Sequence, residues 1–236
     1  LAASAIRYYQ KQGLECFYLA TPGENPEKTI VQHELGDCFV RVGKLGDYEA
    51  VIKAIKGKVD VLVTDSLMGL QRMVLDQLAG KGKTPEDYKI WTPCHDKFRG
   101  CIIDSIESVN KIIISLCPSE RTVDSFLNPT VKGQSSSAPS MIGAELEGKQ
   151  GTKVLSLFQQ AGYLETNVVK DKDGKAEVER LIHFEPDSRL LTRTNGLLTP
   201  FTEPIELEGG LDTWEFLMGK FEEHRNPPLD RLGRGV

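Results

Sequence analysis

Two carboxylates follow apolar stretches of the sequence, each where a strand of an open α/β sheet would end. Asp65 closes the run VDVLVT at 59–64 and is followed by Ser66, and Glu24 lies in the loop after the apolar run at 14–20. The carboxyl ends of parallel strands meet at the edge where such sheets bind ligands. We therefore expect Asp65 and Glu24 to lie at the same edge of a sheet.

Metal-assisted hydrolysis is the chemistry that these residue types favour. Mg²⁺ prefers oxygen ligands and keeps several waters, so Asp65 is the candidate to hold a Mg²⁺-bound water and Glu24 to orient an attacking water. Ser115, near the end of the run 111–116, is the candidate to sense a terminal phosphate. Structural roles account for the same residues: Asp65 and Ser66 are favoured helix N-caps, Glu24 suits a solvated loop, and Ser115 could satisfy backbone groups.

Such a site also requires a loop that cradles phosphates. No GxxxxGK[ST] motif occurs in the 236 residues, so nothing in them supplies its backbone amides and lysine. The order of helix, strand, loop, helix and Asp-terminated strand is nevertheless the order that comes after such a loop, and the chain opens in mid-helix with LAASA. We therefore expect the phosphate loop to lie just upstream of Leu1. The four histidines lack the spacing of zinc ligands.

Apolar strands alternate with helices up to residue 116, which indicates crossover connections and a mostly parallel sheet. The expected strands span 14–20, 38–42, 59–64 and 111–116, and the expected helices span 1–12, 47–55, 66–78 and 93–109.

The remainder of the sequence has a different character. The stretch 118–152, rich in serine and glycine, is typical of a long functional loop. Beyond it, 163–169 and 177–184 flank the turn DKDGK and predict a β-hairpin, followed by a last helix at 213–224 and a tail at 229–236.

Several of these segments resemble those of a known family. LAASAIRYYQKQGLECFYLATPGENP resembles the segment after the phosphate loop in RecA-like ATPases, and VDVLVTDSLMGLQRMV resembles their second, Asp-bearing motif. The later order of KIIISLCPSERT, GAELEGKQGTKVLSLFQQAGYL, the hairpin and RLLTRTNGLLTPFTEPIEL is similar to phage-encoded RecA-like single-strand annealing ATPases, and the similarity extends to about Glu208. It implies an α/β fold: a RecA-like core with a mostly parallel sheet, helices on both faces and an antiparallel β-hairpin at one edge. The core would span 1–208, with a C-terminal helix and tail at 209–236.

The resemblance also implies a function. A protein of this kind would bind single-stranded DNA in recombination or annealing and hydrolyse ATP, with Mg²⁺, at the interface of a homo-oligomeric ring or filament. Asp65 and Ser66 would bind the cofactor, and Arg193 in TRTNG would reach a neighbouring subunit's nucleotide. Pro22 stands where the family's water-activating glutamate belongs, so Glu24 is a displaced candidate. Two alternatives stay open: a non-catalytic RecA-like module that binds DNA or a partner, and a partitioning-type ATPase.

DNA contacts are implied for two loops, at about 79–89 and within 118–152. Glycine and serine there would let the backbone approach phosphate. The local cations are Lys81, Lys83, Lys132, Lys149 and Lys153. Two solvated surface loops account for the same charges equally well.

Composition and charge bound these expectations. The net charge of -5 argues against a globally basic nucleic-acid binder and leaves room for a local basic groove. No apolar run is long enough to cross a bilayer, no secretory signal opens the chain, and the five cysteines include no CxxC pair. We therefore expect reduced thiols in a cytoplasmic protein, in the host cytoplasm if it is encoded by a phage.

Overall fold

The chain divides into two compact units in a computed structural model. The structure describes residues 1–24, 35, 38–79, 88–123, 140–146, 150–170, 176–185, 190, 192–195, 197, 201–207 and 212–226. The first unit comprises Leu1–Pro118 and Glu145–Leu157, and the second comprises Ser119–Ala144 and Phe158–Val236. The division expected from the sequence, at residue 208, concerns the extent of an ATPase core and stays a prediction.

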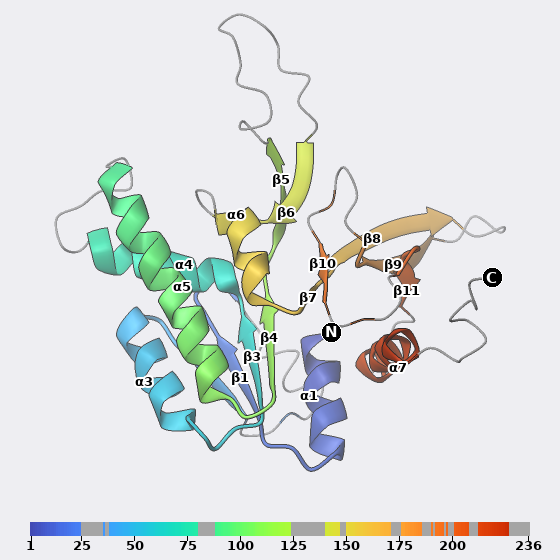
Figure 1. The fold of residues 1–236 in the computed structure, drawn as a ribbon, viewed down its shortest axis with the longest axis horizontal. Helices are drawn as coiled ribbons and strands as arrows, with labels where there is room; N and C mark the ends of the chain where they lie inside the picture. Colours follow the sequence, from blue (N-terminus) through green and yellow to red (C-terminus); the bar gives the residue numbers. More distant parts are fainter. Residues whose placement is uncertain are drawn as a thin grey trace, which may run out of the picture. The chain divides into compact units, whose positions relative to one another are not determined.

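A four-stranded parallel sheet forms the centre of the first unit (Figure 1). Its strand order is β2 (Phe39–Arg41), β1 (Cys16–Ala20), β3 (Val61–Asp65) and β4 (Ile112–Leu116). In this register Ala20 and Leu116 lie opposite Asp65, so three strands reach their carboxyl ends together. The α/β class and the mostly parallel sheet expected from the sequence are confirmed.

Helices flank this sheet. Helix α1 (Ala2–Lys11) lies on one face, and α3 (Leu45–Ile55), α4 (Leu67–Ala79) and α5 (Trp91–Ser108) lie on the other (Figure 1). Shorter helical turns are η1 (Tyr88–Ile90), α6 (Gln150–Lys153) and η2 (Val154–Leu157). Among the described residues, no helix combines the length and the apolar character needed to cross a bilayer.

Strand β3 lies at the centre of the core because both of its faces are covered. Val61, Leu62 and Val63 are fully buried, as a continuous β-branched and apolar run between two parallel neighbours requires. All five cysteines are free thiols, as expected, and burial raises the pKa of Cys101 to about 11. That thiol therefore stays protonated at neutral pH.

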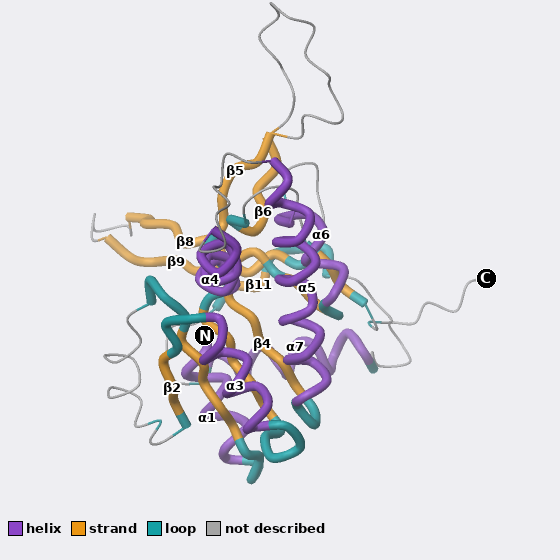
Figure 2. Tube along the Cα trace, turned by 90° about the vertical axis from the view of Figure 1, so that its left-hand side faces the viewer, coloured by secondary structure: helices purple, strands orange, loops and turns teal. Residues whose placement is uncertain are grey.

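The second unit consists of small antiparallel sheets and one helix. Strands β8 (Tyr163–Lys170) and β9 (Ala176–His183) form the predicted hairpin, and β11 (Ile205–Glu206) pairs with β9 (Figure 2). The other pairs are β5 (Ser119–Val123) with β6 (Ser140–Ala144), and β7 (Gln160–Ala161) with β10 (Arg193–Thr194). Helix α7 (Thr213–Arg225) completes the unit.

Aromatic packing holds α7 within this unit. The Phe221 ring of α7 lies 4.9 Å from Phe184 and 5.4 Å from Phe201, centroid to centroid. Gly162, between β7 and β8, permits the close approach of Phe184, because a Cβ there would lie 2.7 Å from that ring. The unit therefore has an apolar centre of its own.

Two expectations from the sequence need correction. The hairpin is not at an edge of the parallel sheet, because its strands pair with each other and with β11 in a separate three-stranded sheet. The stretch 118–152 is not structureless throughout, since its two ends pair as β5 and β6 and its last residues enter α6. The residues between those strands, and the tail at 229–236, lie outside the described residues.

Candidate functional site

Asp65, the last residue of β3, is held by a tyrosine from the neighbouring strand. Tyr18 of β1 pairs with Val63, two residues before Asp65, so the Tyr18 and Asp65 side chains point to the same side of the sheet. The Tyr18 hydroxyl donates a hydrogen bond to Asp65 Oδ2. Tyr18 itself is only 4% exposed. The carboxylate therefore has a fixed orientation at the carboxyl edge of the sheet.

The pKa values of Asp65 and Tyr18 are shifted by burial and by neighbouring groups. Burial raises the pKa of the Asp65 carboxyl above its ordinary value, the Tyr18 hydrogen bond lowers it, and nearby Glu24 raises it. Burial also raises the pKa of the Tyr18 phenol, so its hydroxyl stays protonated and remains a donor. Glu24 is thus close enough to influence the pKa of the Asp65 carboxyl.

Thr21 joins the ends of β1 and β3 immediately behind this carboxylate. Its backbone N–H donates to the Asp65 carbonyl at 2.7 Å. Its hydroxyl accepts from the Ser66 N–H at 2.8 Å and donates to the Ser66 carbonyl at 2.9 Å. Thr21 is fully buried and Ser66 is 1% exposed, so these bonds are shielded from water. The Asp65–Ser66 peptide bond that they bracket is cis.

Helix α4 starts directly at this junction and approaches it closely. Ser66 Oγ accepts from the Gly69 N–H at 3.4 Å, so Ser66 rather than Asp65 has the position and contact of a helix N-cap. A Cβ at Gly69 would lie 2.1 Å from Thr21 Oγ1 and 2.8 Å from the Pro22 carbonyl oxygen. The helix can therefore occupy this place only with glycine at residue 69.

Glu24 reaches the site through a short turn after β1. Gly23 has a φ of +99°, a conformation that favours glycine, and the Glu24 N–H points back to the Thr21 carbonyl at 3.4 Å. Arg41 Nη2 donates to the Glu24 carbonyl oxygen at 3.2 Å and thereby fixes the Glu24 backbone. The structure thus brings the two sequence-predicted carboxylates, Asp65 and Glu24, to the same edge.

Ser115 occupies a neighbouring strand but the other side of the pleat. It pairs with Thr64, whereas Asp65 pairs with Leu116. Since successive side chains of a strand alternate, Ser115 points to the side of Thr64 and away from that of Asp65.

The remaining predicted residues are distributed over the chain. Arg193 begins β10, opposite Ala161 of β7, in the second unit. Lys153 is an exposed residue at the end of α6 and is close enough to His95 to lower that residue's pKa, after the larger effect of burial. The other expected DNA-contacting lysines, Lys81, Lys83, Lys132 and Lys149, lie outside the described residues.

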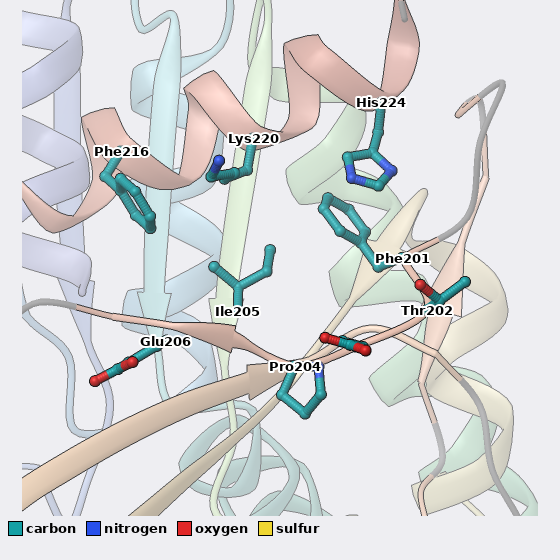
Figure 3. Close-up of a pocket in the computed structure, with 9 residues that line it drawn as sticks. Phe201, Thr202, Pro204, Ile205, Glu206, Phe216, Lys220 and His224 are labelled. Carbon is teal, nitrogen blue, oxygen red and sulfur yellow. The ribbon is translucent and has the colours of Figure 1, made fainter. Parts of the chain in front are cut away.

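Two cavities elsewhere are separate from Asp65. The larger, about 480 Å³, lies in the second unit between α7 and the segment 201–206. Phe216 and Lys220 approach it from α7, opposite Ile205, and the His224 ring lies beside Phe201 (Figure 3). The smaller, about 190 Å³, lies between α3 and α5. Neither cavity is lined by a residue that the sequence singled out.

In the described part of the chain, no group of three or more His, Cys, Asp or Glu side chains could hold a metal ion. Asp65 and Glu24 are two carboxylates at one edge, and Mg²⁺ is commonly bound through one or two carboxylates together with substrate phosphates. The residues present therefore fit Mg²⁺ that arrives with a nucleotide.

Replacing Gly69 with alanine should destabilise the protein. The added methyl group overlaps the Thr21 hydroxyl and the Pro22 carbonyl, and overpacking of this kind costs about 1–3 kcal/mol. Chemical denaturation checks this free energy of unfolding. The control is Gly100→Ala in α5, where a Cβ meets no atom within 4 Å and alanine should stabilise the helix by about 0.5–1 kcal/mol. Equal changes in the free energy of unfolding for the two variants would contradict the close contact of Gly69 with Thr21 and Pro22.

Asp65→Asn should raise the stability of the nucleotide-free protein at neutral pH. The folded-state pKa of Asp65 is raised, so its contribution to stability is complete below the unfolded value of 3.8 and is lost as pH rises through the folded value. Asparagine avoids that loss and still accepts the Tyr18 hydrogen bond. Urea unfolding from about pH 7 to pH 4 should show an advantage of the variant that shrinks as the pH falls. A gain in unfolding free energy that does not depend on pH, or no gain at pH 7, would refute the raised pKa of Asp65.

The sequence was also compared with known proteins. No model of a protein family matches the chain, and no curated protein matches it significantly. The conclusions about this site therefore depend on its geometry and on the α/β fold alone.

Proposed function

We propose that this chain belongs to an ATP-dependent, single-stranded-DNA-binding protein of recombination or annealing, with a RecA-like ATPase core that acts in the cytoplasm. The observation that carries the proposal is the convergence of Asp65, Glu24 and the start of α1 at the carboxyl edge of a parallel sheet (Figure 1). This edge is where open α/β sheets bind ligands. A helix that begins there presents the positive end of its dipole, which favours phosphate.

The order of the strands supports a phosphate loop at this place. Among the described strands, β4 pairs on one edge only, with β3. A further parallel strand beside β4 would end next to the Asp65 edge, and a loop from that strand would lead to the start of α1. We place the phosphate loop in that connection.

The roles of the carboxylates follow from their positions. Magnesium bound with the nucleotide would neutralise charge on the phosphates as they are cleaved. Asp65 would hold a water of that ion, while the Tyr18 hydroxyl fixes the carboxylate through Oδ2. Glu24, held by Gly23 and Arg41, would accept a proton from the attacking water. The Ser66 hydroxyl accepts a hydrogen bond from the Gly69 N–H in the first turn of α4. Ser66 therefore supports the site through its backbone, which is hydrogen-bonded to Thr21.

Assembly and DNA binding complete the proposal. Arg193 lies in the second unit, and a guanidinium supplied by a neighbouring subunit would stabilise charge on the transferred phosphoryl group. This arrangement requires a homo-oligomer, as a ring or a filament. Single-stranded DNA would contact the exposed Lys153 and the loops that precede it.

A non-catalytic module is the second candidate, and one observation favours it. Pro22 occupies the position after β1 at which the resemblance places a water-activating carboxylate, and Glu24 reaches the site only by way of a turn. A protein that has lost hydrolysis would keep the fold and the DNA-binding loops. Measuring whether the natural protein hydrolyses ATP distinguishes the ATPase from the non-catalytic module.

Hydrolysis should depend on Asp65 in the full-length natural protein. Asp65→Ala should lower the kcat for phosphate release by at least about a hundredfold while circular dichroism shows the same fold, since it removes the group that orients the metal-bound water. The control is Asp76→Ala, the same change at an exposed position of α4, which should leave kcat unchanged. Unchanged turnover in Asp65→Ala would remove Asp65 from the mechanism, and a wild type without turnover would favour the non-catalytic module.

Binding of single-stranded DNA should be governed by salt and not by base sequence. Replacing Lys132 and Lys149 together with glutamine should weaken binding to oligo(dT) and oligo(dC) alike. It should also reduce the slope of log K against log salt by about 1.4, or about 0.7 for each phosphate that is no longer neutralised. Fluorescence anisotropy across a salt series measures both effects. Lys58→Gln, at an exposed position before β3, is the control. Weakening restricted to one sequence, or no weakening, would contradict phosphate-based binding.

A further inference from the structure

The hairpin of the second unit has two faces of opposite character. Alternate residues of β8 and β9 point to opposite sides, and the register pairs Val168 with Val178 and Thr166 with Arg180. We call one side the valine face; it consists of Leu164, Thr166, Val168, Lys170, Ala176, Val178, Arg180 and Ile182. We call the other side the glutamate face; it consists of Tyr163, Glu165, Asn167, Val169, Glu177, Glu179, Leu181 and His183.

Most of the apolar side chains of the valine face are exposed to solvent, whereas a sheet with one face in water normally exposes polar side chains there. On the valine face Val168 is 72% exposed, Val178 is 51% exposed and Leu164 is 42% exposed. Of the large apolar side chains that are exposed in the described part of the chain, most lie on this hairpin. The valine face therefore has the composition of a surface that another molecule covers.

Polar contacts hold side chains of the glutamate face in place. The His183 Nε2 atom lies 2.9 Å from Glu165 Oε2, and Asn167 Nδ2 donates to Glu179 Oε2 at 3.5 Å. The Tyr163 ring lies 5.8 Å from the His183 ring. The glutamate face carries three carboxylates, those of Glu165, Glu177 and Glu179.

Charge distinguishes the molecules that could cover the valine face. Its charged groups are Lys170 and Arg180, both exposed. Two valine faces packed together would bring these cations against their own copies. A nucleic acid would meet few cations here, with the carboxylates of the glutamate face on the same ribbon. The glutamate face of another copy offers carboxylates for both cations and the side chain of Val169, 41% exposed, for apolar contact.

We propose that the valine face of one molecule binds the glutamate face of a second copy of this chain. Because the two surfaces differ, the contact is head-to-tail and repeats from copy to copy, giving a ring or an open filament. Arg180 and Lys170 of one copy approach Glu177 and Glu179 of the next, around a centre formed by Val168 and Val178. The contact requires neither nucleotide nor DNA, so it stands or falls separately from the proposed ATPase activity.

Sedimentation velocity of the chain, without nucleotide or DNA and at low salt, tests this contact. The wild type should associate as its concentration rises, and added salt should weaken the association. Arg180→Glu should weaken association at least tenfold, because a carboxylate then meets the glutamate face. Glu177→Lys together with Glu179→Lys should do the same from the other side. Lys58→Glu, the same charge reversal at an exposed position of the first unit, should have no effect.

The decisive variant combines these three substitutions with Lys170→Glu in one chain. With both faces reversed, their charges are complementary again, so association should return to within about threefold of the wild type. Thermal melting followed by circular dichroism verifies that each variant is folded. A wild type that stays monomeric, an Arg180→Glu variant that associates normally, or a combined variant that stays monomeric would each overturn the proposal. So would loss of oligo(dT) binding in Arg180→Glu without any change in association, since that result assigns the face to nucleic acid.

Discussion

The candidate site depends on the hydrogen bonds between Thr21 and Ser66. A single buried threonine hydroxyl both accepts from and donates to the backbone of Ser66, and the Thr21 N–H binds the carbonyl of Asp65. Buried backbone groups left without partners cost about 1–3 kcal/mol each, so these bonds specify how β1 and β3 end relative to each other. The positions of Glu24 and of the start of α4 both follow from that junction.

A carboxylate that is held in place and partly withdrawn from water is characteristic of a functional position. Burial disfavours the charged form of Asp65, and Glu24 adds a second negative group nearby. A protein selected for stability alone would gain by replacing such a residue, which is the usual relation between stability and activity at functional sites. The same edge also receives the positive end of α1. Together these features describe a place suited to a cation and a phosphate at the same time.

The sequence predicted the central strands well because they are apolar throughout. The runs ending at Ala20 and Asp65 lie between neighbouring strands and are largely buried, and such strands leave a clear apolar pattern. The run ending at Leu116 is apolar as well, although its strand pairs only with β3 among the described strands. Tyr18 was missed because a tyrosine within an apolar strand is typical of a core residue, and only the register shows that it shares a face with Asp65. Strands β5 and β6 were missed because SERTV and SMIGA lack an apolar alternation and are far apart in the chain. Their pairing is a long-range contact that no local pattern encodes.

Gly69 has a consequence for how this protein can diverge through evolution. The helix that begins after Ser66 lies so close to Thr21 that only a hydrogen atom fits between them. Substitution at either position alone disturbs the other, so the two positions must change together or not at all. Distant relatives should therefore retain the pair of a small hydroxyl residue after β1 and a glycine three residues beyond the helix cap. Such a spacing, read together with a strand that ends in aspartate, identifies relatives whose overall sequence similarity has been lost.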